Sequence, residues 1–378
     1  MRIKSVIFLF FIFLSGNFSG RNLDSLMNKL AVSPKNDSNK VWLVYTLGYE
    51  FVQSGNFSDG KKQLERSLKL SDSIGFKGAL STIYNGLGIT YMELGDYPKA
   101  IDFTLKSINI CEREKNVRGE GKGFSALAII YCYLGDFGHA KENFRQVLAI
   151  SEKLNDERMK FSCIANLAAT FNAEKKLDSA EVFYYKALEY YLSKNLKGDL
   201  ARVYLNLGNL EIERKNLKKS IEYSLKALKL YRETDDKLSL CLIYINMGAL
   251  YAEAKEYTKG VVMLDSGLVL AREIGSKDKM NLALQNLAIT WNSMGNSEKA
   301  LGYLEESTAL KDSLLSEGNG KSISEMQTRF DTAKKQKEIE LMSKDKSIRN
   351  LQESERDANI KRQRWFIYSL VAGFIIFL

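Results

Sequence analysis

Residues 81–100 read STIYNGLGITYMELGDYPKA, and the same pattern returns at 121–140 as GKGFSALAIIYCYLGDFGHA. A Leu or Met followed by Gly or Ala marks the seventh and eighth positions of every 40-residue unit. Self-similarity at a fixed period is the signature of a repeat architecture. The sequence therefore predicts seven copies of one structural unit over 41–316. These units begin at residues 41, 81, 121, 161, 201, 241 and 281.

Each unit carries the apolar spacing of two helices. Positions 4, 7, 8 and 11 form one helical stripe, and positions 20, 24, 27, 28 and 30 form a second. In the second unit the turn between them is Gly95-Asp96-Tyr97. Position 20 is always Gly, Ala or Ser, so the two helices can approach closely. One such hairpin cannot bury its own apolar face, and stacking seven of them gives a continuous core. The sequence predicts an all-α solenoid.

At these positions the chain resembles the tetratricopeptide repeat (TPR) family, over roughly residues 41–314. The resemblance implies a right-handed solenoid of about seven helix-turn-helix repeats. The units have 40 residues rather than the usual 34, and we expect the extra residues to extend the second helix. Residues 21–40 are expected to hold a capping helix. Several long-repeat members bind peptides or protein partners, so the resemblance implies a protein-binding module.

The composition argues against an enzyme. A single histidine, His139, disfavours His-based catalysis and His-ligated metal sites, and the four cysteines show no C-x-x-C pattern. No phosphate-loop spacing is present. We therefore expect no catalytic residues, no metal and no cofactor. The net charge of +9 permits contact with acidic surfaces without indicating nucleic acid, which is not expected as a partner.

The two ends of the chain suggest a membrane protein. Residues 1–20 have the layout of a signal peptide or an uncleaved N-terminal anchor. Residues 365–378 are uncharged and read as a truncated transmembrane helix or, alternatively, a short hydrophobic tail. Residues 321–364 read as a charged, coiled-coil-like stalk that forms a homodimer, or as a single solvated helix. These features predict a membrane-anchored protein whose repeat domain is extracytoplasmic, periplasmic in a bacterium.

This order of segments is similar to the TPR input half of membrane-anchored bacterial sensor kinases and regulators. The resemblance implies the sensory input part of a signal-transduction protein, with the membrane contacted through the C-terminal helix. Two alternatives remain open. One is a passive envelope scaffold for the assembly of protein complexes, and the other is a cytoplasmic peptide-responsive regulator.

A recurring asparagine marks the candidate binding site. Positions 2, 6, 9 and 13 of the first helix lie opposite its core stripe, on the face that lines the concave groove in the TPR family. An amide both donates and accepts, so amides one repeat apart can pair with the backbone of an extended peptide or protein segment. Alternatively, each amide only bonds a neighbouring helix. The predicted groove residues are Asn166, Asn206, Asn246 and Asn286 at position 6, Arg202 and Lys122 at position 2, and Asn209 at position 9.

Overall fold

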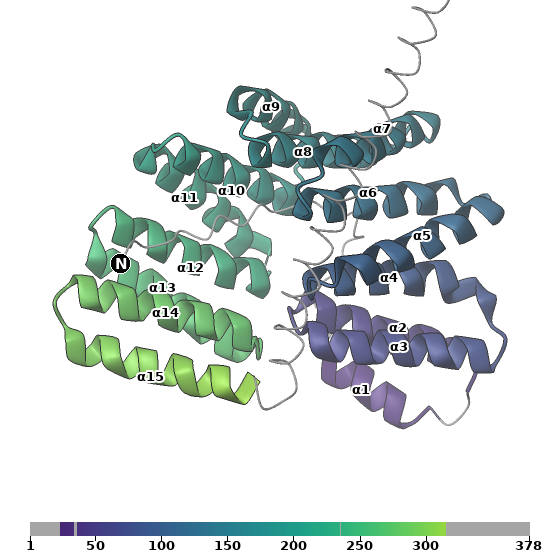
Figure 1. The fold of residues 1–378 in the computed structure, drawn as a ribbon, viewed down its shortest axis with the longest axis horizontal. Helices are drawn as coiled ribbons and strands as arrows, with labels where there is room; N and C mark the ends of the chain where they lie inside the picture. The colour runs from purple at the N-terminus through teal and green to yellow at the C-terminus, as the bar shows by residue number, and fades with distance from the viewer. Residues whose placement is uncertain (1–22, 34–35, 235, 315–378) are drawn as a thin grey trace, which may run out of the picture. The chain divides into compact units, whose positions relative to one another are not determined.

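The computed structural model describes residues 23–33, 36–234 and 236–314, which form helices without strands (Figure 1). The all-α repeat fold predicted from the sequence is confirmed. A short helix, α1 (Leu23–Ala31), precedes seven pairs of antiparallel helices, here called hairpins one to seven. In chain order the pairs are α2 (Ser38–Gln53) and α3 (Phe57–Ser73), α4 (Leu80–Glu93) and α5 (Tyr97–Arg113), α6 (Val117–Tyr133) and α7 (Phe137–Lys153), α8 (Glu157–Ala173) and α9 (Leu177–Ser193), α10 (Lys197–Glu213) and α11 (Leu217–Thr234), α12 (Lys237–Glu253) and α13 (Tyr257–Glu273), and α14 (Lys277–Ser293) and α15 (Ser297–Leu314); a single 3-10 turn, η1 (Lys77–Ala79), leads into α4.

Helices α2 to α10 and α12 to α14 are each followed within two residues by a residue with positive φ, and these residues fall at multiples of 20 from Gly55 onward. After α4, Gly95 has φ of 75°, and the N–H of Asp96 returns to the carbonyl of Tyr91 at 2.9 Å. The Asp96 side chain then accepts from the N–H of Lys99 and caps the next helix. The equal spacing makes both helices of hairpins three and four 17 residues long. The expectation that the extra residues lengthen only the second helix is therefore wrong.

In three hairpins the turn between the two helices has a lysine with positive φ, and this predicts a stabilising substitution. Lys215 has φ of 60° and is exposed, and its ammonium makes no ion pair with any described residue. A left-handed conformation costs an L-residue about 1 kcal/mol or more, partly offset by the freedom glycine has when unfolded. Lys215→Gly should raise the free energy of unfolding by about 0.5–1 kcal/mol, measured by urea denaturation. Lys229→Gly, inside α11, serves as the control and should lower it by a similar amount.

Small residues let the two helices of a hairpin come close together. In hairpin one the Ser67 hydroxyl donates to the carbonyl of Val41 at 2.8 Å, and in hairpin two Ser107 donates to Ser81 at 2.7 Å. Both serines occupy position 27 and are buried. A larger side chain at this position would push the second helix away from the start of the first. The small residues identified in the sequence thus set the helix spacing.

Successive first helices touch one another along one side of the stack. Helix α2 contacts α4, α4 contacts α6, α6 contacts α8, α8 contacts α10, and α12 contacts α14. We call the side formed by positions 2, 6, 9 and 13 of these helices the inner face. Every candidate groove residue named above lies on it. The second helices pack behind them, each against the first helix of its own hairpin and of the next.

The predicted localisation requires a correction. None of the described helices combines the length and the apolar composition that a membrane span requires. The membrane-anchored, extracytoplasmic placement is corrected on this finding: no described helix could serve as the anchor, and helices such as α3 and α11 are amphipathic with a charged face. The predicted segments 1–20, 321–364 and 365–378 lie outside the described residues.

Candidate functional site

The four position-6 asparagines come from successive first helices but are not equivalent. Asn166 of α8 and Asn206 of α10 are buried, with 1% and 0% of their surface exposed, and neither is without a partner. Asn246 of α12 and Asn286 of α14 are half-buried. The contact between α12 and α14 places these last two on adjacent helices. The structure thus separates an enclosed pair of amides from an accessible pair.

The accessible amides have little to bond within the protein. The Asn286 Nδ2 donates to the carbonyl of Leu282 at 2.9 Å, one turn earlier in the same helix. Asn246 makes no hydrogen bond to any residue that the structure describes. A half-buried amide without a protein partner favours a ligand or water, since burying polar groups unpaired is costly. The alternative, that each amide bonds a neighbouring helix, does not describe this pair.

Arg202 is held by a buried carboxylate that the sequence analysis missed. Asp199, in the first turn of α10, accepts hydrogen bonds from Arg202 and from Arg158 of α8, the latter at 3.3 Å. Burial acts to lower the pKa of the Arg202 guanidinium, but the charge of Asp199 and its hydrogen bond raise it above its ordinary value. The Arg202 Nε is buried without a hydrogen bond to the described residues. Arg202 is therefore largely neutralised, with one donor unused.

The other two predicted groove residues differ in exposure. Asn209 is buried and is not without a partner. Lys122 is exposed, and it forms no ion pair with the part of the chain that the structure describes. The inner face thus offers an unneutralised positive charge at hairpin three and accessible amides at hairpins six and seven.

Tyrosines lie on or beside the inner face in hairpins one to three. The rings of Tyr45 and Tyr49 on α2 stack with centroids 6.0 Å apart, and Tyr97 stacks on Tyr133 at 6.3 Å. Burial, followed by the charge of Glu50, raises the pKa of Tyr49 to about 12. These rings were not among the predicted groove residues. Their signal was present in the sequence, since Tyr45, Tyr49 and Tyr133 fall on or beside the predicted groove positions.

The first and last hairpins meet. A methyl group placed on Gly55, in the turn of hairpin one, would lie 3.6 Å from Ser276 Oγ, just before α14, and 3.7 Å from Leu238 Cδ1 at the start of α12. The Glu93 residue keeps an exposed surface, but desolvation of its carboxyl raises the pKa of that group, and the charge of Lys279 of α14 opposes the change. The inner face is therefore flanked by both ends of the array.

A second buried carboxylate replaces an aromatic ring in hairpin five. Glu211 is 2% exposed at position 11, where all six other hairpins carry Phe, Tyr or Trp. Arg214 donates to it at 3.1 Å and also to Glu181 of α9 at 2.8 Å. The hydrogen bond to Glu181 is the largest cause that raises the pKa of Arg214 above its ordinary value. This network ties hairpin four to hairpin five and is structural in character.

Neither the histidine nor the cysteines form a reactive cluster. His139 is exposed and bonds Asp136 at 2.7 Å through its Nδ1. Cys111, Cys132, Cys163 and Cys241 are free and buried, as expected of core residues. Within 23–33, 36–234 and 236–314, no three His, Cys, Asp or Glu side chains gather in a way that could hold a metal ion.

Known proteins resemble this chain in the repeat region. The tetratricopeptide repeat family model matches residues 79–153 and 199–259. The response regulator aspartate phosphatase A of Bacillus subtilis is 26% identical over 183 residues, which cover 46% of this chain and 47% of that protein. The chain thus spans about half the length of the curated relative that it matches.

Solved structures show the same fold. A Rap protein complexed with competence and sporulation factor is 15% identical, with a TM-score of 0.53 over 78% of this chain and 92% of that chain. The apo form of the quorum sensor NprR from B. thuringiensis is 16% identical, with a TM-score of 0.51 over 76% of this chain and 80% of that chain. The chain therefore carries matches to tetratricopeptide repeats at residues 79–153 and 199–259, and it shares its helical repeat fold with these solved structures.

Proposed function

We propose that the inner face binds an extended peptide or protein segment and that the chain is a peptide-responsive regulator, acting as the sensory part of a signalling system. The half-buried, unbonded amide of Asn246 is the observation that carries this proposal. An extended backbone presents an N–H and a C=O at every residue, and a primary amide can bond both. Asn286 repeats the arrangement on the adjacent helix, where its Oδ1 remains available.

The remaining groove residues extend this proposed site along the array. Asn166, Asn206 and Asn209 would contribute where the ligand exchanges their present contacts for its own. Lys122 and, to a smaller extent, the largely neutralised Arg202 add positive charge, which favours an acidic side chain or a terminal carboxylate in the ligand. The stacked tyrosines of hairpins one to three offer flat apolar surface for its side chains.

The names of the relatives support a regulatory role. One solved neighbour is a Rap protein in complex with a factor, and another is a quorum sensor. The curated relative is named a response regulator aspartate phosphatase. We propose that this chain acts by binding rather than as an enzyme itself, with no cofactor.

Peptides selected from a random display library on the full-length chain test this proposal. Their affinity would be measured by fluorescence anisotropy for the wild type and for a variant carrying Asn246→Ala and Asn286→Ala. Loss of two hydrogen bonds should weaken binding by about tenfold or more. Lys229→Ala, on the exposed face of α11, is the matched control and should bind like the wild type. Thermal unfolding of each variant separates lost binding from lost folding.

Undiminished affinity in the double variant would contradict the site. The site would also be contradicted if every enriched peptide bound the double variant as tightly as it binds the control Lys229→Ala. Binding losses that match the losses in stability would instead assign the amides to packing.

A further inference from the structure

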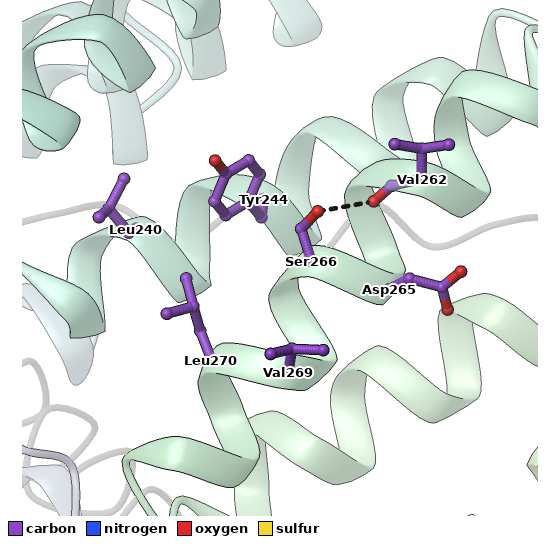
Figure 2. Close-up of a pocket in the computed structure, with 7 residues that line it drawn as sticks. All are labelled: Leu240, Tyr244, Val262, Asp265, Ser266, Val269 and Leu270. Atoms are coloured by element: carbon purple, nitrogen blue, oxygen red, sulfur yellow. Dashed lines mark hydrogen bonds between the residues drawn. The ribbon is translucent and has the colours of Figure 1, made fainter.

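A hollow lies on the side of hairpin six formed by its second helix, away from the proposed peptide site. Its volume is about 590 Å³. Figure 2 shows side chains from two helices around it. Leu240 and Tyr244 come from α12, and α13 contributes Val262, Asp265, Ser266 and Val269 among others.

The hollow exists because hairpin six lacks a covering side chain that three other hairpins have. At position 26, hairpins two, four and five carry a lysine that lies over an aromatic ring. In hairpin five the Lys226 ammonium lies 5.5 Å from the ring centroid of Tyr204, which occupies position 4. The Lys226 ammonium also lies 5.4 Å from the ring centroid of Tyr223, at position 23 of its own helix. In hairpins two and four the lysine lies over this position-23 ring, with Lys106 5.2 Å from Phe103 and Lys186 5.3 Å from Phe183.

Hairpin six has Tyr244 at position 4 but Ser266 at position 26. The serine hydroxyl turns back to its own helix and donates to the carbonyl of Val262 at 2.9 Å (Figure 2). Among the described residues, the cation that lies against the Tyr244 ring is the Arg232 guanidinium of α11. It donates two hydrogen bonds, of 3.1 and 2.8 Å, to the Tyr244 hydroxyl. The space that a lysine stem fills in hairpin five is therefore left to solvent.

The surrounding surface has the composition of a docking face. Val262 and Val269, two turns apart on α13, are 54% and 53% exposed. The corresponding face of α3 carries four charged residues, namely Lys62, Glu65, Arg66 and Lys69. On α13 this face keeps one charge, that of Asp265. Exposed aliphatic side chains around a single charge are typical of a site that contacts another protein.

Asp265 supplies the electrostatic part of the site. No cation comes within ion-pair distance of its carboxylate among the described residues. The charged groups that face it are Lys299 and Arg272, which act on it from farther away. Arg272 is paired with Glu306 at 2.6 Å, and the Lys299 ammonium lies 4.1 Å from the Trp291 ring centroid. The acid is thus open to an external positive charge.

We propose that this hollow binds a lysine or arginine side chain presented by another protein. The aliphatic stem would lie on Tyr244 between Val262 and Val269, and the charge would lie at Asp265. The hollow would thereby receive from a partner what Lys226 supplies within hairpin five. The Asp265 carboxylate, which has no cation within ion-pair distance among the described residues, favours such a group over a neutral one.

The test uses n-butylammonium, which reproduces the lysine side chain, with methyl NMR of the full-length chain. We expect saturable shifts at the methyl groups of Leu240, Val262 and Val269, with a dissociation constant on the order of 10 mM. Butanol should bind at least about threefold more weakly, and butyrate should not compete. Asp265→Asn should weaken the binding of butylammonium several-fold.

Ser266→Lys gives the sharpest comparison, because it restores the residue found in hairpins two, four and five. Its own side chain should fill the hollow and weaken butylammonium binding by about tenfold or more. Ser266→Ala should bind like the wild type. The proposal is overturned if Ser266→Lys binds the probe as tightly as the wild type does. It is equally overturned if butanol or butyrate shifts the same methyl groups as effectively as butylammonium.

Discussion

Replacing Arg214 with methionine should lower the free energy of unfolding by about 3 kcal/mol. Its guanidinium joins the buried Glu211 to Asp178 and Glu181 of α9, at 2.9 and 2.8 Å for the last two. Without it Glu211 would keep only the amide of Asn216 at 3.0 Å and the ammonium of Lys219 at 3.5 Å. Removing one partner of a buried ion pair costs about 3–5 kcal/mol, and we take the lower end because Arg214 is a quarter exposed.

The matched control combines Arg214→Met with Glu211→Tyr. Tyrosine stands at the same position in hairpins two, three and six, as Tyr91, Tyr131 and Tyr251. An apolar replacement of a buried ion pair is often neutral or stabilising, so the double variant should recover most of the loss. Urea denaturation followed by circular dichroism measures both. A double variant no more stable than Arg214→Met alone would show that Glu211 is not the group left uncompensated.

Gly248→Ala should cost about 2–3 kcal/mol, although alanine is the better helix former. A methyl group added at Gly248 would lie 2.4 Å from Leu264 Cγ and 2.9 Å from the carbonyl oxygen of Gly260. One of these neighbours is backbone of α13 and cannot rotate aside. The two helices of hairpin six would therefore have to separate. Thermal unfolding measures the loss.

Gly302→Ala is the companion variant. Gly302 also lies within a helix, α15, but a methyl group there meets nothing within 4 Å. This substitution should raise the free energy of unfolding by about 0.5–1 kcal/mol, since only the conformational entropy of glycine is removed. If the two substitutions shifted the unfolding midpoint in the same direction, close packing at Gly248 would not be the cause.

The repeat fold could be predicted because its determinants are local. The residue pairs Leu87-Gly88 and Leu207-Gly208 recur at a fixed interval, and each helix closes its own hydrogen bonds within a few residues. The turn chemistry is equally local, as at Gly95 and Asp96. The lengths of the two helices depend on where the left-handed residues fall, and that 20-residue spacing was overlooked in the sequence.

The candidate site was only partly predictable, because its details depend on residues far apart in the chain. The recurring asparagine made four positions look equivalent in the sequence. In the structure Asn206 is buried, whereas Asn246 is half-buried. Asp199 pairs with Arg158 across 41 positions, and Gly55 meets Ser276 only after the turns of the intervening hairpins accumulate. The hollow at Ser266 is different. It could have been found in the sequence, since position 26 changes from lysine to serine.

Backbone methylation of a bound peptide tests the proposed inner-face site most directly. A peptide selected on the full-length chain would be compared with analogues N-methylated at one residue at a time. If the amides of Asn246 and Asn286 bond the backbone of the ligand, two separate peptide residues should donate their N–H groups to them. Methylation at either of these two residues should weaken binding by about tenfold, and methylation at the residues between them should have little effect. Uniform tolerance of methylation along the whole peptide would contradict the account.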